Sequence, residues 1–240
     1  MIDCGLPIKR MESALLALDI HPSELSAIFL THEHYDHTAS LRIKHPFPQK
    51  YGIPVYASSG LWRHLEHKTG ILETSLKRVV MPNCNMRVGD FTVRSVPKPH
   101  DAVDPIAFTL RARRQSISVV TDLGTVTEPV FAAMRESDYI ILESNHDREL
   151  ELFSGRPRSL INRVLSRHGH LSNQQAAEAL QRVTSHRLQG IALGHLSLDC
   201  NRPELALDTV RSALAGTDYR GFLVALPHHE VSDWLPVQQY

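Results

Sequence analysis

Apolar residues recur along this chain with two different periods, and segments of the two kinds alternate from one end to the other. Met11, Leu15 and Leu18 fall on the period of an amphipathic helix, whereas residues 91–96 and 116–121 alternate as a half-buried strand does. The helical period predicts helices at residues 9–20, 59–68, 128–136, 158–166, 173–184 and 203–215. Alternation and short apolar runs predict strands at residues 26–31, 54–57, 91–96, 107–111, 116–121, 139–142, 190–194 and 222–226. Interleaved strands and helices predict sheets that are covered by helices on the outside.

Polar side chains stand where several of the predicted strands end. His32, Asp122, Glu143 and His195 each fall at the end of an apolar run, and His100 follows another strand closely. Residues at strand ends can converge on one cleft while the sheets hold them rigidly. We therefore treat these side chains as candidates for one site.

The densest group of such residues lies in residues 29–40, which read FLTHEHYDHTAS. Side chains at i and i+2 of an extended chain point the same way, so His32 and His34 can bind one ion. If the chain then turns into a helix, Asp36 and His37 face a second position. Imidazole and carboxylate groups suit zinc, iron or manganese. The alternative is a solvated histidine-rich loop, and the spacing, the preceding strand and the remote partners favour the metal site.

The remaining ligands come from later in the chain. A pair of ions needs a carboxylate that can bridge them, and Asp122 in VVTDLG is the candidate for that role. We expect one ion to be held by His32, His34 and His100, and the other by Asp36, His37 and His195. Each ion then shares Asp122, and room remains for a bridging water.

Composition limits the class of protein. The chain has 240 residues, 42% of them hydrophobic, which predicts one globular domain over residues 1–240. The 26 Lys and Arg residues balance 26 Asp and Glu residues, so there is no global nucleic-acid signal. Cys4, Cys84 and Cys200 form no metal-binding pair and fit a reducing compartment. The absence of a membrane span or signal peptide predicts a cytoplasmic protein that does not contact membranes.

Four segments in order, THEHYDH, PKPHDAVDP, VVTDLG and LGHLS, resemble the metallo-β-lactamase superfamily. Within it, IDCGLPIKRM, LESNHD and GHLSNQQAAEAL resemble the YycJ/WalJ-like branch, a group of predicted exonucleases. The resemblance implies an α+β fold, a four-layer αββα sandwich with the metal site at one edge. It also implies a two-metal phosphodiesterase related in fold to tRNase Z and RNase J. Family members normally carry a strand and a Ser-Gly-Ser-x-Gly-Asn loop before the IDCG segment, so we expect the N-terminal strands to be missing.

A mechanism follows from the predicted ions. Two divalent ions, with zinc expected before manganese or iron, lower the pKa of a shared water to ~7 and give a bridging hydroxide. Asp36 is placed to orient that hydroxide and accept its proton. His146 in LESNHD is the candidate acid for the leaving oxygen, and Glu143 is expected to orient a nearby ligand or histidine. The alternative for His146 is a loop histidine bonded to backbone.

A second motif, RHGHLSN at residues 167–173, predicts phosphate binding. Ser172 or Asn173 can cap the helix that follows, and a helix N-terminus can receive a phosphate. His170 adds a donor, and Arg167 adds positive charge. The alternative is a capped surface helix with solvated arginines.

Three functions fit these observations. The first is a nuclease, expected to be a 5′-to-3′ exonuclease whose partner is DNA rather than RNA. The second is a small-molecule hydrolase of the same fold, acting on a thioester, lactone or cyclic phosphodiester. The third is a non-catalytic metal-binding protein, against which the full ligand set argues. A basic groove at the metals favours the nuclease, and a closed apolar pocket favours the small-molecule enzyme. The sequence does not determine the oligomeric state.

Overall fold

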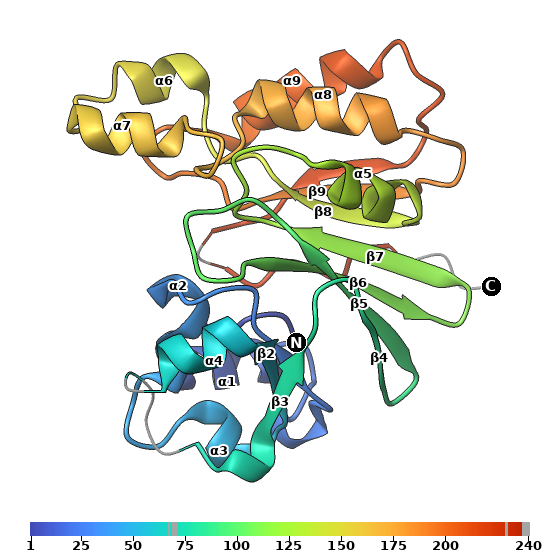
Figure 1. The fold of residues 1–240 in the computed structure, drawn as a ribbon. Helices are drawn as coiled ribbons and strands as arrows, with labels where there is room; N and C mark the ends of the chain where they lie inside the picture. The colour runs from blue at the N-terminus through green and yellow to red at the C-terminus, as the bar shows by residue number, and fades with distance from the viewer. Residues whose placement is uncertain (67, 69–71, 229, 237–240) are drawn as a thin grey trace. The chain divides into compact units, whose positions relative to one another are not determined.

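The computed structural model describes residues 1–66, 68, 72–228 and 230–236, and the chain forms two compact units. The first unit comprises Met1–Pro97 with Ala102–Ile106, and the second comprises Lys98–Asp101 with Ala107–Tyr240. Figure 1 shows the elements of both units. A single domain over residues 1–240 stays a prediction, and its last four residues lie outside the described ones.

The first unit contains a small parallel sheet with the strand order β1-β2-β3. β1 (Ile28–Phe29) pairs with β2 (Val55–Ser58), which pairs with β3 (Lys77–Val80). β4 (Asn85–Val88) and β5 (Phe91–Pro97) form an antiparallel hairpin in the same unit. Its helices are α1 (Ile8–Leu16), α2 (Tyr35–Thr38), α3 (Phe47–Tyr51) and α4 (Ser59–Leu65), with 3-10 turns η1 (Pro22–Glu24), η2 (Ala39–Leu41) and η3 (Thr74–Leu76).

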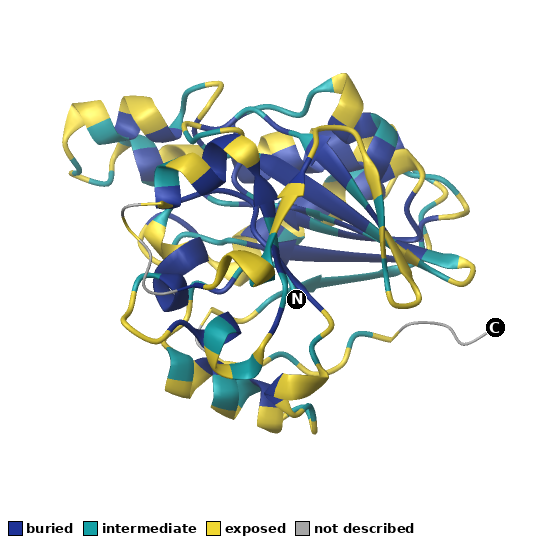
Figure 2. Ribbon diagram, turned by 60° about the horizontal axis from the view of Figure 1, so that its bottom comes forward, coloured by how far each residue is buried: buried dark blue, intermediate teal, exposed yellow. Residues whose placement is uncertain are grey.

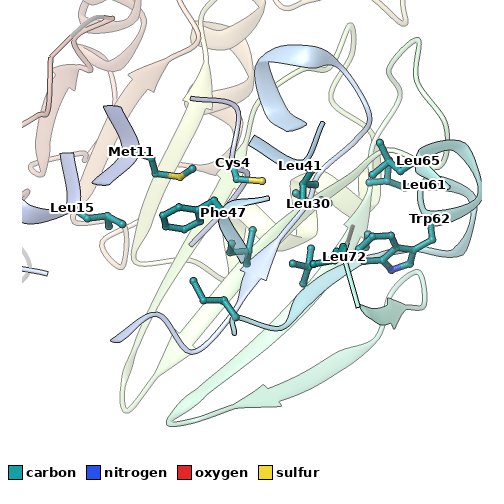
Figure 3. Packing of buried hydrophobic residues seen from close by; sticks show 14 residues of the cluster. Cys4, Met11, Leu15, Leu30, Leu41, Phe47, Leu61, Trp62, Leu65 and Leu72 are labelled. Carbon is teal, nitrogen blue, oxygen red and sulfur yellow. The ribbon is translucent and has the colours of Figure 1, made fainter. Parts of the chain in front are cut away.

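A continuous apolar core holds the first unit together. Met11 and Leu15 of α1 pack in one cluster with Leu30, Phe47 and the buried residues of α4 (Figure 3). Burying one large apolar side chain stabilises a fold by about 1.5–3 kcal/mol. This core fixes the end of β1, and the histidine-rich segment begins directly after it.

The strands of the second unit follow the order β10-β9-β8-β7-β6. β7 (Gln115–Val120), β8 (Tyr139–Glu143), β9 (Gly190–Gly194) and β10 (Phe222–Ala225) run parallel, and β6 (Ile106–Ala112) pairs antiparallel with β7. The turn of this hairpin contains Arg113 in a left-handed conformation, with a φ of 53°. Parallel neighbours end at the same edge of a sheet, so the residues that follow β7, β8 and β9 are brought together.

Helices cover the strands of the second unit. They are α5 (Glu128–Arg135), α6 (Arg148–Leu152), α7 (Arg158–Val164), α8 (Asn173–Val183) and α9 (Pro203–Leu214). The longest two, α8 and α9, lie side by side (Figure 1). Ala176, Leu180 and Val183 of α8 are buried while its other face is exposed, and Figure 2 shows the same division on the other helices. The amphipathic pattern read from the sequence therefore corresponds to one buried face per helix.

The boundaries differ from the predicted ones at a few elements. The strand predicted at 26–31 is only β1, because two residues alone have register partners in β2. The helix predicted at 59–68 ends at Leu65, and residue 67 lies outside the described ones. Across the described ranges, no helix combines the length and the apolar character that crossing a bilayer requires.

Candidate functional site

The predicted metal ligands fall into two groups, one in each compact unit. The first group follows β1 and consists of His32, His34, Asp36 and His37. The second group consists of the predicted ligands His100, Asp122 and His195 together with Glu143 and His170, which contact them.

In the first group, His32 and His34 direct ring nitrogens at each other. His32 Nε2 lies 2.9 Å from His34 Nδ1, and the two rings are nearly perpendicular, at 79°. The other nitrogen of His32, Nδ1, lies 2.9 Å from the Thr31 hydroxyl. Two nitrogens bound to one tetrahedral zinc are separated by about 3.3 Å, because each Zn–N bond is about 2.0–2.1 Å. The pair is therefore arranged to share one cation.

His37 is oriented by an aspartate that lies far away in sequence. Asp3 Oδ2 is 2.7 Å from His37 Nδ1, and the same carboxylate accepts hydrogen bonds from the backbone N–H and hydroxyl of Thr31. The bond to Nδ1 leaves Nε2 as the ring's coordinating nitrogen, a common arrangement behind metal-bound histidines. Asp3 was not among the predicted site residues. Its only signal was its position in the IDCG segment, directly after the apolar residue Ile2.

Asp36 and His37 leave the strand direction because α2 starts at Tyr35. The Asp36 side chain is 67% exposed, and its Oδ2 lies 3.4 Å from His37 Nε2. The backbone of Asp36 is held by Gly5, since a Cβ at Gly5 would lie 1.4 Å from the Asp36 carbonyl oxygen. Only glycine allows this approach, so the N-terminal segment fixes where the turn places Asp36.

Glu33, the remaining acid of the motif, has a structural role. Its two carboxylate oxygens accept from the backbone N–H of Val103, at 3.1 and 3.0 Å. Glu33 is buried, and this contact ties residues 102–106 to the histidine-rich segment. Side chains alternate along an extended chain, so Glu33 points away from His32 and His34 and takes a structural role while they face the candidate site.

The second group stands at the carboxyl ends of three adjacent parallel strands. Asp122 follows β7 by two residues, Glu143 ends β8, and His195 follows β9. Asp122 and His195 adopt left-handed backbone conformations, with φ of 56° and 55°. Such residues cost about 1–3 kcal/mol each and persist where surrounding structure enforces them, often at functional sites.

Glu143 is the organising carboxylate of this group. It is fully buried, and its Oε1 lies 2.7 Å from His170 Nδ1 and 2.8 Å from His195 Nδ1. Its Oε2 accepts from the backbone N–H groups of Leu123 and Leu171. Burial alone raises the pKa of Glu143, but the charges and hydrogen bonds of the two histidines outweigh it and lower the pKa to about 2. Glu143 is thus ionised and orients both rings through Nδ1.

Asp122 lies between two imidazoles. Its Oδ1 is 3.3 Å from His195 Nε2 and 4.0 Å from His100 Nε2. His100 is held through Nδ1, which lies 3.1 Å from the Gly169 carbonyl oxygen. A carboxylate with an imidazole on either side has the arrangement that a bridging ligand needs. Asp122, Glu143, His170 and His195 each offer one ligand atom within 4.8 Å of the others, which suits a cation.

Two histidines of this group have shifted pKa values of opposite sign. Burial lowers the pKa of His100 to about 4, with the Lys98 charge adding to the effect and Asp122 opposing it. Burial also acts to lower the pKa of His170, but the charge and hydrogen bond of Glu143 outweigh it, so the pKa is raised. His100 is therefore neutral, as a metal ligand must be, and His170 holds a proton more firmly.

His146, the predicted proton donor, is enclosed by the fold. It is fully buried, and neither ring nitrogen has a hydrogen-bond partner within the described part of the chain. Its backbone carbonyl accepts from Asn173 N–H, and burial lowers the pKa of its ring against the opposing charges of Glu151 and Glu143. A proton donor must reach the leaving oxygen. These observations favour a structural role, and the predicted acid role stays a prediction.

Of the residues predicted to bind phosphate, some are used within the fold and one joins the candidate site. Ser172 caps α8 in a capping box with Gln175, and both Ser172 and Asn173 are buried. The Asn173 amide bonds to Ser144 and to Asn201, so its polar atoms are used within the fold. Arg167 is exposed. His170 alone joins the cluster around Glu143, and this coupling was missed because the two residues are 27 positions apart.

Comparison with known proteins supports the predicted fold. Residues 1–191 match the family model described as the Beta-lactamase superfamily domain. The metallo-β-lactamase fold protein YhfI of Bacillus subtilis superposes with a TM-score of 0.67 at 16% identity, over 94% of this chain and 83% of that one. The predicted fold class, the α+β sandwich of the metallo-β-lactamase type, is thereby confirmed.

Two curated relatives are similar over most of their lengths. Exodeoxyribonuclease YycJ of Bacillus anthracis is 31% identical over 99% of this chain and 89% of its own. Exodeoxyribonuclease WalJ of Streptococcus pneumoniae serotype 2 is 33% identical over 91% of this chain and 81% of its own. The chain therefore belongs to the metallo-β-lactamase superfamily, as a hydrolase of the branch that contains YycJ and WalJ.

Proposed function

We propose that this protein is a dinuclear metal-dependent phosphodiesterase that removes nucleotides from the end of a DNA strand, in the 5′-to-3′ direction. One observation carries the proposal. His37, His170, His195 and His100 each have Nδ1 bound to an oxygen within their own unit, which leaves Nε2 as the coordinating or proton-bearing atom. Relatives named exodeoxyribonuclease support DNA as the substrate.

The ligand set of the proposal is the predicted one. His32, His34 and His100 would hold one ion, Asp36, His37 and His195 would hold the other, and Asp122 would serve both. The residues fit such ions in two respects: the converging nitrogens of His32 and His34, and the position of Asp122 between His100 and His195. Zinc is the first choice for this donor set, and manganese and iron accept the same ligands.

Bound ions would supply Lewis acidity, for activating a water molecule as the nucleophile and for neutralising the charge of the phosphate. Asp36 is the one exposed carboxylate of the first group, so it is placed to orient that water and accept its proton. Its neighbour His37 is fixed by Asp3, which keeps the pair in a constant geometry.

The proton for the leaving oxygen comes from His170 in this proposal, rather than from His146. The His170 ring is 18% exposed, so it can reach a substrate, whereas His146 is fully buried. The charge and hydrogen bond of Glu143 outweigh burial and raise the pKa of His170, which favours the protonated ring. Glu143 acts through His170 and therefore serves as a positioning residue.

The test is incubation of metal-loaded protein with single and duplex DNA, with and without a 5′-phosphate, and with RNA of the same sequence. The proposal expects mononucleotides released progressively from the 5′ end of DNA, and none after chelation. Release from internal positions, or from RNA alone, would contradict it.

The small-molecule alternative is tested in the same preparation. A thioester, a lactone and a cyclic nucleotide are offered in place of DNA. Turnover of one of these with no action on DNA would replace the nuclease by the small-molecule hydrolase.

A further inference from the structure

The helices α6 and α7 and the turn that follows them carry an excess of positive charge. Residues 148–167 include five arginines and two glutamates, in a chain whose charges balance over its whole length. Glu151, one of those glutamates, is fully buried. The turn between the helices also presents Phe153, which is 85% exposed. A basic segment with an exposed aromatic ring is a combination that single-stranded nucleic acid recognises.

This segment forms one wall of a pocket. The pocket has a volume of about 320 Å³ and is lined by Arg156, Leu160 and Arg163, and by His170 and His195 of the candidate site. Leu160 and Arg163 are three residues apart in α7 and so share one helix face. Ligand pockets span about 300–1,000 Å³, so this one suits a single small unit.

The two arginines are held in place with donors to spare. Arg156 bonds the buried Glu151 at 3.2 Å and Asp199 at 2.7 Å. Arg163 is bonded through Nε to Asp101, and its terminal nitrogens make no hydrogen bond within the described part of the chain. A guanidinium carries five N–H donors in a planar fork that matches a phosphate. Arg163 therefore offers its fork to a ligand in the pocket.

The rest of the lining is mixed, with leucines beside the polar residues Asn145, Ser197, Asp199 and His228. Leu196 and Leu198 line it together with Leu160, and Leu198 is 61% exposed. A pocket that combines arginines with leucines suits a ligand with an anionic and an apolar part. A nucleotide has both, since its phosphate is charged and its sugar and base offer flat, weakly polar faces.

We propose that this pocket binds the nucleotide next to the scissile bond, with its phosphate between Arg156 and Arg163 and its sugar and base against the leucines. The inference rests on the proposed function, because His170 and His195 of the candidate site line the same pocket and would lie beside the bound nucleotide. It adds a positioning site outside the predicted metal ligands. Its phosphate is either the terminal one or an internal one of the strand.

The experiment measures binding apart from cleavage. Fluorescence anisotropy of a labelled DNA single strand is recorded in chelator, as a function of salt, for wild type and Arg163→Gln. Arg158→Gln is the matched control, since Arg158 lies on the same helix, is exposed and does not line the pocket. We expect Arg163→Gln to weaken binding roughly tenfold and to reduce the slope against salt by about one phosphate contact. Arg158→Gln should change the affinity less than about twofold.

Strands with a 5′-phosphate, a 3′-phosphate or no terminal phosphate separate the two sources of the anion. A loss that Arg163→Gln shows only with one phosphorylated end assigns the site to that terminal phosphate, and an equal loss with all three assigns it to an internal one. Equal affinities for Arg163→Gln and Arg158→Gln on every strand would overturn the inference.

Hydrolysis of bis(4-nitrophenyl) phosphate by the metal-loaded protein tests the reaction separately. It is measured on the wild-type protein, because this substrate contains no neighbouring nucleotide and so reports the reaction apart from binding in the pocket. If the protein binds DNA through Arg163 but hydrolyses neither substrate, the proposed function fails and the phosphate site stands. If it hydrolyses both while the two variants bind alike, the phosphate site fails and the function stands.

Discussion

The two groups of candidate ligands are built in opposite ways. The first lies within six consecutive residues, and the backbone between β1 and α2 sets the directions of the His32, His34 and His37 side chains. The second draws single residues from three strand ends, and Glu143 buried beneath them orients His170 and His195 together. Local backbone geometry alone positions the ligands of a contiguous motif, whereas the folded sheet must bring the ligands of a dispersed group together.

This difference predicts which substitutions affect a single ligand and which affect several ligands at once. In the first group, the supporting contacts come from Asp3 and Gly5, which reach the motif from the N-terminal segment. In the second, the Glu143 carboxylate alone contacts two histidines and two backbone N–H groups. A substitution at a ligand should remove the chemistry alone, and a substitution at a support should also loosen the ligands.

The largest effect is expected for Asp36→Ala. Asp36 is exposed, so the fold should persist, while hydrolysis should fall by about 10³-fold or more because a metal ligand and proton acceptor is lost. Steady-state cleavage of DNA, with circular dichroism of the same samples, measures both. Asp90→Ala, an exposed aspartate in the β4–β5 turn, is the control. Full activity in Asp36→Ala would remove this residue from the mechanism.

Gly5→Ala should damage the first group through packing. The added Cβ would meet the Asp36 carbonyl at 1.4 Å, so we expect a loss of about 3 kcal/mol in the free energy of unfolding. Urea denaturation measures it, and metal content should fall with it. Gly216→Ala is the control, because nothing lies within 4 Å of a Cβ there. Equal stability of the two variants would show that the segment does not pack against Asp36 as described.

The sequence was informative where chemistry is local. The ligands from His32 to His37 are contiguous, and the ends of β7, β8 and β9 could be placed because apolar runs stop at Asp122, Glu143 and His195. The fold class was predicted as well, through the motifs that carry the resemblance.

The sequence was uninformative where a contact joins distant segments. Asp3 meets His37 across 34 positions, and Glu143 meets His170 across 27. No spacing rule relates such pairs, because only the folded sheet brings them together. Burial was equally hidden, so the pattern that suggested His146 as an acid could not show that its ring is enclosed.

The supports are compared directly by Asp3→Asn and Glu143→Gln. Each should lower metal affinity by about 10–100-fold, because removing an outer-shell carboxylate releases the orientation of the ring it holds. Metal titration with a competing chelator measures the affinity of each ion. We expect both variants to weaken chiefly the ion assigned to Asp36, His37 and His195, because Asp3 orients His37 and Glu143 orients His195. Asp19→Asn is the control, since Asp19 is exposed and shares the left-handed φ of Asp3. Identical affinities in the Asp19 and Asp3 variants would leave Asp3 without a role at the metals.

The smallest effect is a change in the pKa of His170, and it tests how Glu143 acts within the second group. Glu143→Gln removes the charge that raises the pKa of His170, so the pKa of that ring should fall in the metal-free protein, as measured by NMR titration. The sign also fixes the pH dependence of stability. Because folding raises the pKa of His170, its contribution is complete below pH 6.5 and is lost as pH rises through the folded value. Glu143 acts at the other end, since its contribution is present above pH 4.5 and is lost as pH falls towards 2. Glu143→Gln should therefore weaken the pH dependence of the unfolding free energy at both the acidic and the alkaline end. An unchanged His170 pKa in this variant would show that Glu143 does not control His170, and would remove His170 from the proton transfer assigned to it.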